Sequence, residues 1–272
     1  MKPASFDYHR ASSLEEAVAL LGSSGDAATL IAGGQSLTPL LNLRLSPSDT
    51  IIDISRLAAL RDTRDLGDSV YLGAGLTHAM FEDGEVPDPA NGLMRKAAGH
   101  IAYRAVRCHG TIGGSVAMAD PAADWPAVLL ALHATAVVLG AGGERRVHMN
   151  DLLTGTYTTS LEPGEMITGF DVRKLSASAR TSYVKFNKKV GAFASSLAVA
   201  VRDGDQVRIV LAGAGPRATL LERVAQAVLN DVGTDRLREM LEAEVAAIVE
   251  DADPYACALH VATLSRALGD IS

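Results

Sequence analysis

The chain has little cysteine, few aromatic residues and no excess of positive charge. Only Cys108 and Cys257 occur in 272 residues, far apart and without metal-ligand spacing, which argues against an iron–sulfur cluster within this chain and against a disulfide framework. Aromatic residues make up 4%, too few for a platform on which nucleic-acid bases stack. The net charge is −7, with acids and bases interspersed, so the sequence contains no basic patch that favours a nucleic-acid partner.

Long apolar runs are also missing. The N-terminus has no apolar segment of the signal-peptide type, and no run approaches the length of a membrane span. Together with the low cysteine content, this predicts a soluble protein of the reducing cytoplasm. The length of 272 residues and the apolar fraction of 48% are enough for one large domain or two moderate ones with a sizeable core.

A glycine-rich motif follows a β-like run at residues 28–31. Two glycines and then small polar residues leave a bare backbone that a ligand can approach closely. The N–H groups of such a turn can converge on an anion. The motif therefore predicts a pyrophosphate cradle, although an ordinary tight turn after a strand has the same composition. Its residues are Ile31, Ala32, Gly33, Gly34, Gln35, Ser36 and Leu37.

A second motif repeats the pattern of a small residue, an apolar residue, two glycines and a hydroxyl. Two such loops can bracket a diphosphate from both sides, and a nearby carboxylate can accept hydrogen bonds from ribose hydroxyls. Neither motif has the glycine spacing of a Rossmann fold or the lysine of a P-loop. The pair predicts a dinucleotide site of another architecture. The residues are Thr111, Ile112, Gly113, Gly114 and Ser115, followed by Asp120 and Asp124.

Together, the two motifs resemble the FAD-binding (medium) subunit of the molybdenum hydroxylases, a family that includes the carbon monoxide dehydrogenase medium subunit and the flavin domain of xanthine dehydrogenase. Residues 6–11 also resemble the start of that family. The resemblance implies FAD on this chain, a large molybdopterin subunit, and a small subunit with two [2Fe–2S] clusters, in a dimer of heterotrimers. Electrons would pass from the clusters through FAD to NAD⁺, a quinone or oxygen. No catalytic residue and no metal ligand is expected on this chain.

The resemblance also assigns residues outside the two motifs. It places the hydroxyl of Thr77 against a phosphate or the flavin ring, and Ile101 and Ile167 in apolar contact with the flavin. Lys185 matches a lysine near the flavin, where a positive charge would stabilise the anionic reduced cofactor. Taken without the resemblance, Thr77 fits a helix N-cap, Ile167 a core strand and Lys185 a solvated strand.

Two further residues beside these segments each have two interpretations. His78 is either a polar neighbour of the flavin or a residue in the first turn of a helix. Arg107 either holds the second motif through contacts with carbonyl groups or is a plain surface arginine.

The chain departs from the family pattern at three positions. Ser115 stands where the family usually has asparagine. It keeps a hydroxyl but lacks the second hydrogen-bonding group of the amide. Ala192 stands where an aspartate is frequent, and Phe193 replaces a tyrosine that packs near the ring. These departures leave two alternatives open: a stand-alone flavoprotein that acts directly on a small molecule, and a flavin-free subunit kept for assembly.

The order of the expected elements predicts an α+β fold. By the resemblance, residues 1–176 would form a two-subdomain FAD-binding domain of the PCMH type, with subdomains of about 1–57 and 58–176. Residues 177–272 would form a C-terminal α+β domain, a three-stranded antiparallel sheet with a helical bundle. Its expected strands are 181–188, 195–202 and 206–213, and its expected helices are 220–229, 234–249 and 254–268.

Overall fold

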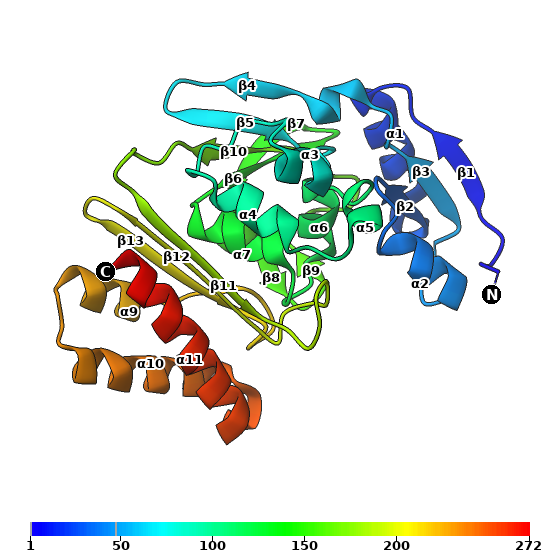
Figure 1. Ribbon diagram of the computed structural model, residues 1–272. Coiled ribbons are helices and arrows are strands. Elements are labelled where there is room, and N and C mark those ends of the chain that lie inside the picture. The colour runs from blue at the N-terminus through cyan, green and yellow to red at the C-terminus, as the bar shows by residue number, and fades with distance from the viewer. Residues whose placement is uncertain (1, 47) are drawn as a thin grey trace.

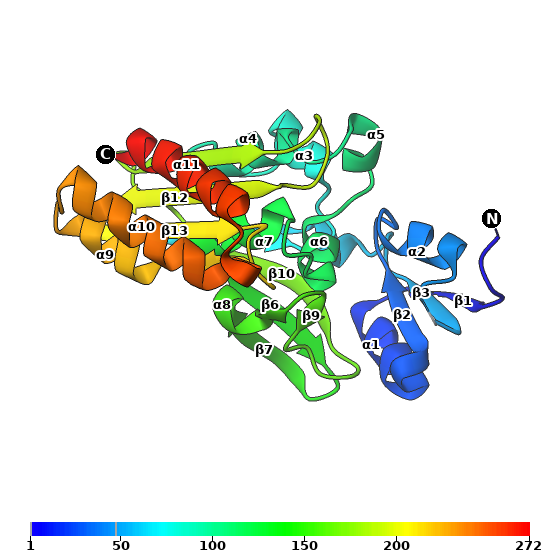
Figure 2. The ribbon, with the colours of Figure 1, turned by 90° about the horizontal axis from the view of Figure 1, so that it is seen from below.

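Three large β-sheets and a two-stranded one, β8-β9, make up the strands of the computed structural model, which describes residues 2–46 and 48–272 (Figure 1). The first sheet is parallel, in the order β1-β3-β2, and α1 packs beside it. Figure 2 shows this N-terminal unit at one end of the molecule and the C-terminal helices at the other. Its elements are β1 (Asp7–Arg10), α1 (Leu14–Ser24), β2 (Ala28–Ile31), α2 (Leu37–Leu43) and β3 (Thr50–Asp53).

The second sheet is antiparallel, in the order β4-β5-β10-β6-β7. One face packs against the central core: Phe170 and Val172 of β10 point into it, while Asp171 between them points to the other face. Helices α3, α4, α6 and α7 lie on the buried side (Figure 1). The strands are β4 (Thr63–Asp65), β5 (Ser69–Gly73), β6 (Thr135–Gly140), β7 (Gly143–His148) and β10 (Met166–Arg173).

The third sheet is antiparallel and has four strands where the sequence predicted three. The fourth, β14, has two residues, Thr219 and Leu220, which pair with β13, too few for a periodic pattern to predict. Both faces of this sheet are buried, because Leu197 and Val199 face the central core while Ala198 and Ala200 face the C-terminal helices. The strands are β11 (Arg180–Phe186), β12 (Ser196–Asp203), β13 (Gln206–Ala212) and β14 (Thr219–Leu220), and the helices are α9 (Glu222–Leu229), α10 (Thr234–Ile248) and α11 (Pro254–Ile271).

Helix α7 (Asp124–Ala131) lies between the second and third sheets, and all eight of its residues are buried. A helix that is apolar all round must be covered on every side, which explains why its first residue, Asp124, is carried into the interior. Within the described ranges, the helices are all too short or too polar to cross a membrane. The remaining elements are α3 (His78–Asp83), α4 (Leu93–Gly99), α5 (Arg104–Arg107), α6 (Ile112–Met118), α8 (Met149–Leu152), β8 (Leu153–Gly155), β9 (Thr158–Thr159) and the 3₁₀ turns Gly25–Ala27, Ala58–Arg61 and Glu250–Ala252.

Candidate functional site

The first glycine motif forms a loop between β2 and α2, as the sequence predicted. A Cβ on Gly33 would lie 2.0 Å from the carbonyl oxygen of His109, so the loop rests directly on the backbone that leads into the second motif. Gly34 has φ +68°, a conformation that favours glycine. Within the described chain, the backbone N–H groups of residues 33–36 donate no hydrogen bond. The loop therefore offers four unused donors at its surface.

The second glycine motif is not a loop, and that part of the prediction is wrong. Thr111 is the N-cap of α6, its Oγ1 accepts from the N–H of Gly114 at 3.1 Å, and both glycines lie in the first helical turn. The N–H groups of Ile112 and Gly113 donate to the carbonyls of Leu76 and Ala74. These amides are therefore already used and cannot form the second half of a backbone cradle.

Close packing explains the first glycine of that turn. A Cβ on Gly113 would lie 2.5 Å from the Cβ of Ala74. Gly114 is exposed, and a Cβ there would meet only the Thr111 hydroxyl, at 2.9 Å. The Ser115 hydroxyl has no hydrogen-bond partner among the residues that the structure describes. The second motif thus contributes hydroxyl groups and the exposed Gly114 to its surroundings, whereas the N–H groups of residues 112–115 are used within the protein.

The two motifs meet a third segment, the turn that ends at Thr77. Thr77 forms a β-bridge with Thr111, and the N–H of His78 donates to the carbonyl of Gly110 at 3.0 Å. Thr77 is also the N-cap of α3, where its Oγ1 accepts from the N–H of Met80. We refer to residues 31–37, Thr77 and residues 111–115 as the motif surface.

A buried ion pair lies near the start of α7. Lys185 Nζ is 2.9 Å and 3.0 Å from the two carboxylate oxygens of Asp124, and the side chains are 3% and 4% exposed. Tyr183 Oη also donates to Asp124, and Lys185 Nζ donates to the carbonyl of His100 at 3.3 Å. Lys185 is therefore not a solvated strand lysine, and its charge is neutralised within the protein.

Burial governs the protonation of this cluster. It raises the pKa of the Asp124 carboxyl, and the ammonium of Lys185 opposes that rise. Burial and the neighbouring carboxylate together raise the pKa of the Tyr183 hydroxyl, so Tyr183 stays a neutral donor. The three groups satisfy one another, as buried polar groups must.

The other predicted residues lie around the motif surface and the buried ion pair. Ile101 follows α4 and packs against the central core, next to the His100 carbonyl. Ile167 is 6% exposed in β10, so its side chain packs in the sheet core. Asp120 accepts from the N–H of Ala122 at 2.8 Å and from Tyr157 Oη at 3.3 Å, contacts that fix the turn between α6 and α7.

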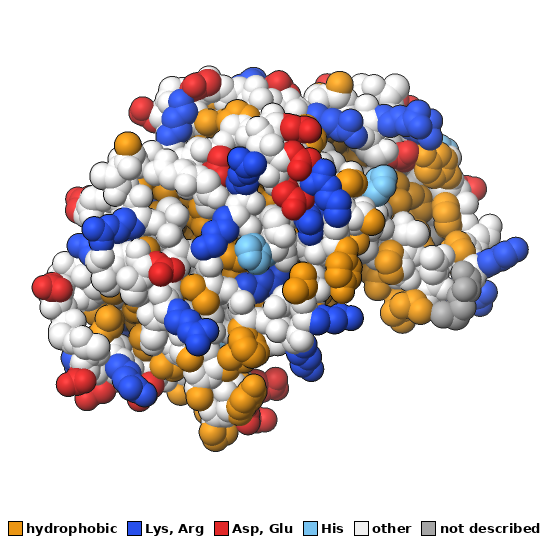
Figure 3. Space-filling model, in the orientation of Figure 1, with side chains coloured by type: hydrophobic (Ala, Val, Ile, Leu, Met, Phe, Trp, Pro, Cys, Tyr) orange, Lys and Arg blue, Asp and Glu red, His pale blue; other side chains and the backbone are white. Residues whose placement is uncertain are grey.

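Arg107 joins α3 to the turn that follows α4. Its guanidinium donates to the carbonyls of Ile101 and Ala102, each at 2.9 Å, and pairs with Glu82 at 2.8 Å. Arg107 therefore binds carbonyl groups, as the first interpretation required, but they belong to the turn after α4 and not to the second motif. Figure 3 shows acidic and basic side chains gathered side by side over α3, where Arg104 joins the same network.

Sequence reasoning missed Tyr183 and His100. Tyr183 stands two residues before Lys185 on β11, so both side chains project from the same face of the strand. That spacing was a usable signal. The role of His100 was not predictable from spacing, because its carbonyl meets a lysine 85 residues away.

His78 lies in the first turn of α3, but it is buried rather than placed as a ligand. Its Nδ1 accepts from Trp125 Nε1 at 2.9 Å, and burial together with the charge of Arg107 lowers its pKa to about 4. Because the folded-state pKa lies below the ordinary 6.5, the stability that neutral His78 contributes is present above pH 6.5. It is lost as the pH falls toward 4.

We expect this loss to reach about 3 kcal/mol in the free energy of unfolding. The measurement is urea unfolding at pH 7.5 and 4.5, compared with the variant His78→Asn. Asparagine keeps an acceptor for Trp125 and does not titrate. An acid-induced loss that is equally large in the variant would show that other groups cause it.

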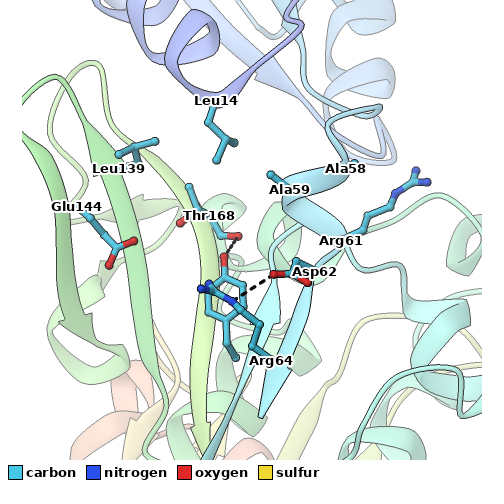
Figure 4. A pocket seen from close by; sticks show the side chains of 10 residues that line it. Leu14, Ala58, Ala59, Arg61, Asp62, Arg64, Leu139, Glu144 and Thr168 are labelled. Carbon is cyan, nitrogen blue, oxygen red and sulfur yellow. Dashed lines mark hydrogen bonds and ion pairs between the residues drawn. The ribbon is translucent and has the colours of Figure 1, made fainter. Parts of the chain in front are cut away.

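A pocket of about 560 Å³ lies away from all of these residues, between α1 and the outer face of the second sheet (Figure 4). Its polar groups are already engaged. Arg64 lies 3.2 Å from Asp62, and Tyr71 Oη donates to the carbonyl of Thr168. Arg61 donates to the carbonyl of Ser55, and Glu144 pairs with Arg146. None of the predicted site residues lines it. In the described chain, no three histidine, cysteine, aspartate or glutamate side chains converge to hold a metal ion.

Comparison with known proteins gives a consistent match. Residues 4–172 match the family described as the FAD binding domain in molybdopterin dehydrogenase. The chain is 34% identical to the carbon monoxide dehydrogenase medium chain of Hydrogenophaga pseudoflava, over 93% of this chain and 89% of that one. It is 37% identical to the 6-hydroxypseudooxynicotine dehydrogenase complex subunit alpha of Paenarthrobacter nicotinovorans, over 80% and 76%.

A solved structure has the same architecture over the whole length. The structure is that of carbon monoxide dehydrogenase from Hydrogenophaga pseudoflava lacking the Mo-pyranopterin moiety of its molybdenum cofactor. The match has a TM-score of 0.93 at 34% identity and covers 100% of this chain and 98% of the other.

Proposed function

We propose that this chain transfers electrons, because it belongs to the family of FAD-binding domains of molybdopterin dehydrogenases. It is the FAD-binding medium subunit of an oxidoreductase of the molybdenum hydroxylase family. In our proposal it receives electrons from [2Fe–2S] clusters of a partner subunit and delivers them to an external acceptor.

The observation that carries this proposal is the loop of residues 33–36. Its four unused N–H groups match the needs of a pyrophosphate, which binds where backbone donors converge. A side chain at Gly33 would fill the space where the loop meets His109. The residues present therefore fit the diphosphate of FAD at the first motif.

The hydroxyls of Thr111, Ser115 and Thr77 are the further polar contacts that we assign to FAD. The accessible residues that would complete the motif surface are Ile31, Ala32, Leu37 and Gly114. Ile112 and Gly113 are buried and would support it from within. When bound, FAD supplies the capacity to accept two electrons and release them singly or in pairs.

The neighbouring residues act on the position of the flavin more than on its charge. Ile101 and Ile167 contribute apolar contact. Because Asp124 neutralises Lys185, we assign this pair and Asp120 to shaping the walls of the site.

We also propose the partner subunits, the cellular location and the division into domains. The resemblance implies a large molybdopterin subunit and a small iron–sulfur subunit, assembled as a dimer of heterotrimers, in the cytoplasm. We propose that the FAD-binding domain comprises residues 1–176, with subdomains of about 1–57 and 58–176, and that the C-terminal domain comprises residues 177–272. The separate sheets of residues 7–53, 63–173 and 180–220 support this division.

Ser115→Ala separates cofactor binding from folding. The Ser115 hydroxyl contacts no other group of the described chain, so its loss is expected to leave the melting temperature within about 1 °C of the wild type. Losing one hydrogen bond to FAD is expected to weaken FAD binding by about three- to tenfold. Flavin fluorescence during titration of the apoprotein measures this. Unchanged FAD affinity would remove Ser115 from the site. Ser5→Ala is the control, because Ser5 is exposed and its hydroxyl likewise makes no hydrogen bond within the described chain.

Purification of the tagged chain from its native source tests the proposed function. We expect two further subunits to co-purify with molybdenum and with four iron atoms per chain, as two [2Fe–2S] clusters require. A flavin-containing chain that purifies alone, without iron or molybdenum, would contradict the electron-transfer role and favour a stand-alone oxidoreductase.

A further inference from the structure

Four basic side chains gather near the C-terminal end of α7, the end opposite Asp124. The rings of His133 and His148 stack with their centroids 5.1 Å apart. Arg208 Nε donates at 2.9 Å to the carbonyl of Ala131, two residues before His133. Arg173 is the last residue of β10, and it lies close enough to His133 for its charge to act on that ring. We call His133, His148, Arg173 and Arg208 the basic cluster.

The charge of this cluster is only partly balanced, because the carboxylate of Asp203 acts on both Arg173 and Arg208. Neither arginine forms an ion pair within the described part of the chain. The nearby Asp203 is engaged by the N–H and hydroxyl of Ser176, and Asp171 on the adjoining strand is paired with Arg146 at 3.1 Å. The chain as a whole has a net charge of −7. Two arginines and two histidines in one place therefore form a local excess of basic groups.

The protonation of the cluster reflects this crowding. Partial burial is the largest cause that lowers the pKa of His133. The neighbouring basic groups Arg208, His148 and Arg173 lower it further. Burial and the charge of Arg173 lower the pKa of Arg208, while Asp203 opposes that shift. These groups come from β7, β10, β12, β13 and the turn after α7. A bound anion would reverse the effect and stabilise the charged form of His133.

We propose that the basic cluster is a binding site for a multivalent oxyanion of the phosphate class. Arginine guanidinium groups bind such anions through two parallel N–H donors, and each protonated imidazole adds a donor. Arg173, His133 and His148 are exposed, so the anion can enter from solvent, either free or as the terminal phosphate of a nucleotide. None of its four residues belongs to the motif surface, and the length of α7 places the cluster roughly 12 Å beyond Asp124.

The test uses the flavin-loaded protein, in which FAD would already occupy the motif surface. Sulfate is the probe for the pH series, because it keeps its double negative charge throughout. We expect sulfate to raise the pKa of His133, followed by the C2–H resonance of its ring, and to bind about tenfold more tightly at pH 6 than at pH 8. Inorganic pyrophosphate and ADP, compared by calorimetry, distinguish a free anion from a nucleotide phosphate.

Two variants remove cluster groups without touching the protein core. Arg173→Gln and His133→Gln are each expected to weaken pyrophosphate binding about tenfold, whereas Arg236→Gln, at an exposed arginine of α10, should have no effect. Tighter binding of pyrophosphate than of ADP indicates a free anion, and the reverse order indicates a nucleotide. The proposal is overturned if sulfate leaves the His133 pKa unchanged, or if both cluster variants bind pyrophosphate as the wild type does.

Discussion

Gly33→Ala is expected to strip FAD from the protein. The added Cβ would lie 2.0 Å from the carbonyl oxygen of His109, 2.6 Å from its carbon and 2.9 Å from the Cα of Gly110. All three atoms belong to the backbone, so no side chain can move aside to make room. The loop of residues 33–36 must lift away from the start of the second motif, and its N–H groups lose their position relative to the hydroxyls of that motif.

We expect FAD affinity to fall by about 100-fold or more, equivalent to about 2.7 kcal/mol, and the purified complex to contain little flavin. The measurement is FAD per chain after release by acid, with circular dichroism to verify folding. Gly22→Ala is the matched control, because nothing lies within 4 Å of a Cβ at that position of α1 and alanine favours a helix. A Gly33→Ala complex with a full complement of FAD would refute our placement of the diphosphate.

Lys185→Met is expected to cost about 3–5 kcal/mol in the free energy of unfolding at pH 8, because it leaves the carboxylate of Asp124 buried without its cation. The sign of the pH dependence follows from Asp124. Burial raises its folded-state pKa, and removing the opposing ammonium raises it further. The stabilising protonated form is therefore present at low pH and lost as the pH rises through that pKa. The penalty should shrink toward pH 5.

Urea unfolding at pH 5 and pH 8 measures the penalty. The double variant Asp124→Asn with Lys185→Met should recover most of it, because no charge is then buried. Lys174→Met is the control: that lysine pairs with Asp65 at the surface, with side chains 38% and 71% exposed, where an ion pair contributes at most about 1 kcal/mol. A pH-independent penalty below 1 kcal/mol for Lys185→Met would contradict the burial argument.

Local chemistry made much of the site predictable. The β-like run 28–31 followed by two glycines does form a strand and a loop, and Thr77 does cap a helix. These features depend on residues adjacent in the sequence, where turn and capping preferences act directly. The family resemblance, confirmed by the match over residues 4–172, supplied the cofactor.

The failures concern interactions between distant residues. Two adjacent glycines disfavour a helix, yet Gly113 and Gly114 begin one, because Thr111 caps it and only glycine fits against Ala74. The ion pair of Asp124 with Lys185 joins residues 61 apart, and no periodic pattern predicts it. Packing against segments remote in sequence decided these features.

The flavin content of the complex isolated from its native source tests the central claim most directly. We predict that acid releases one FAD per copy of this chain, and that the complex shows a flavin absorption spectrum which the matching Gly33→Ala complex lacks. A wild-type complex that contains no flavin, and takes up none on incubation with FAD, would contradict the assignment of this chain as the FAD-binding subunit.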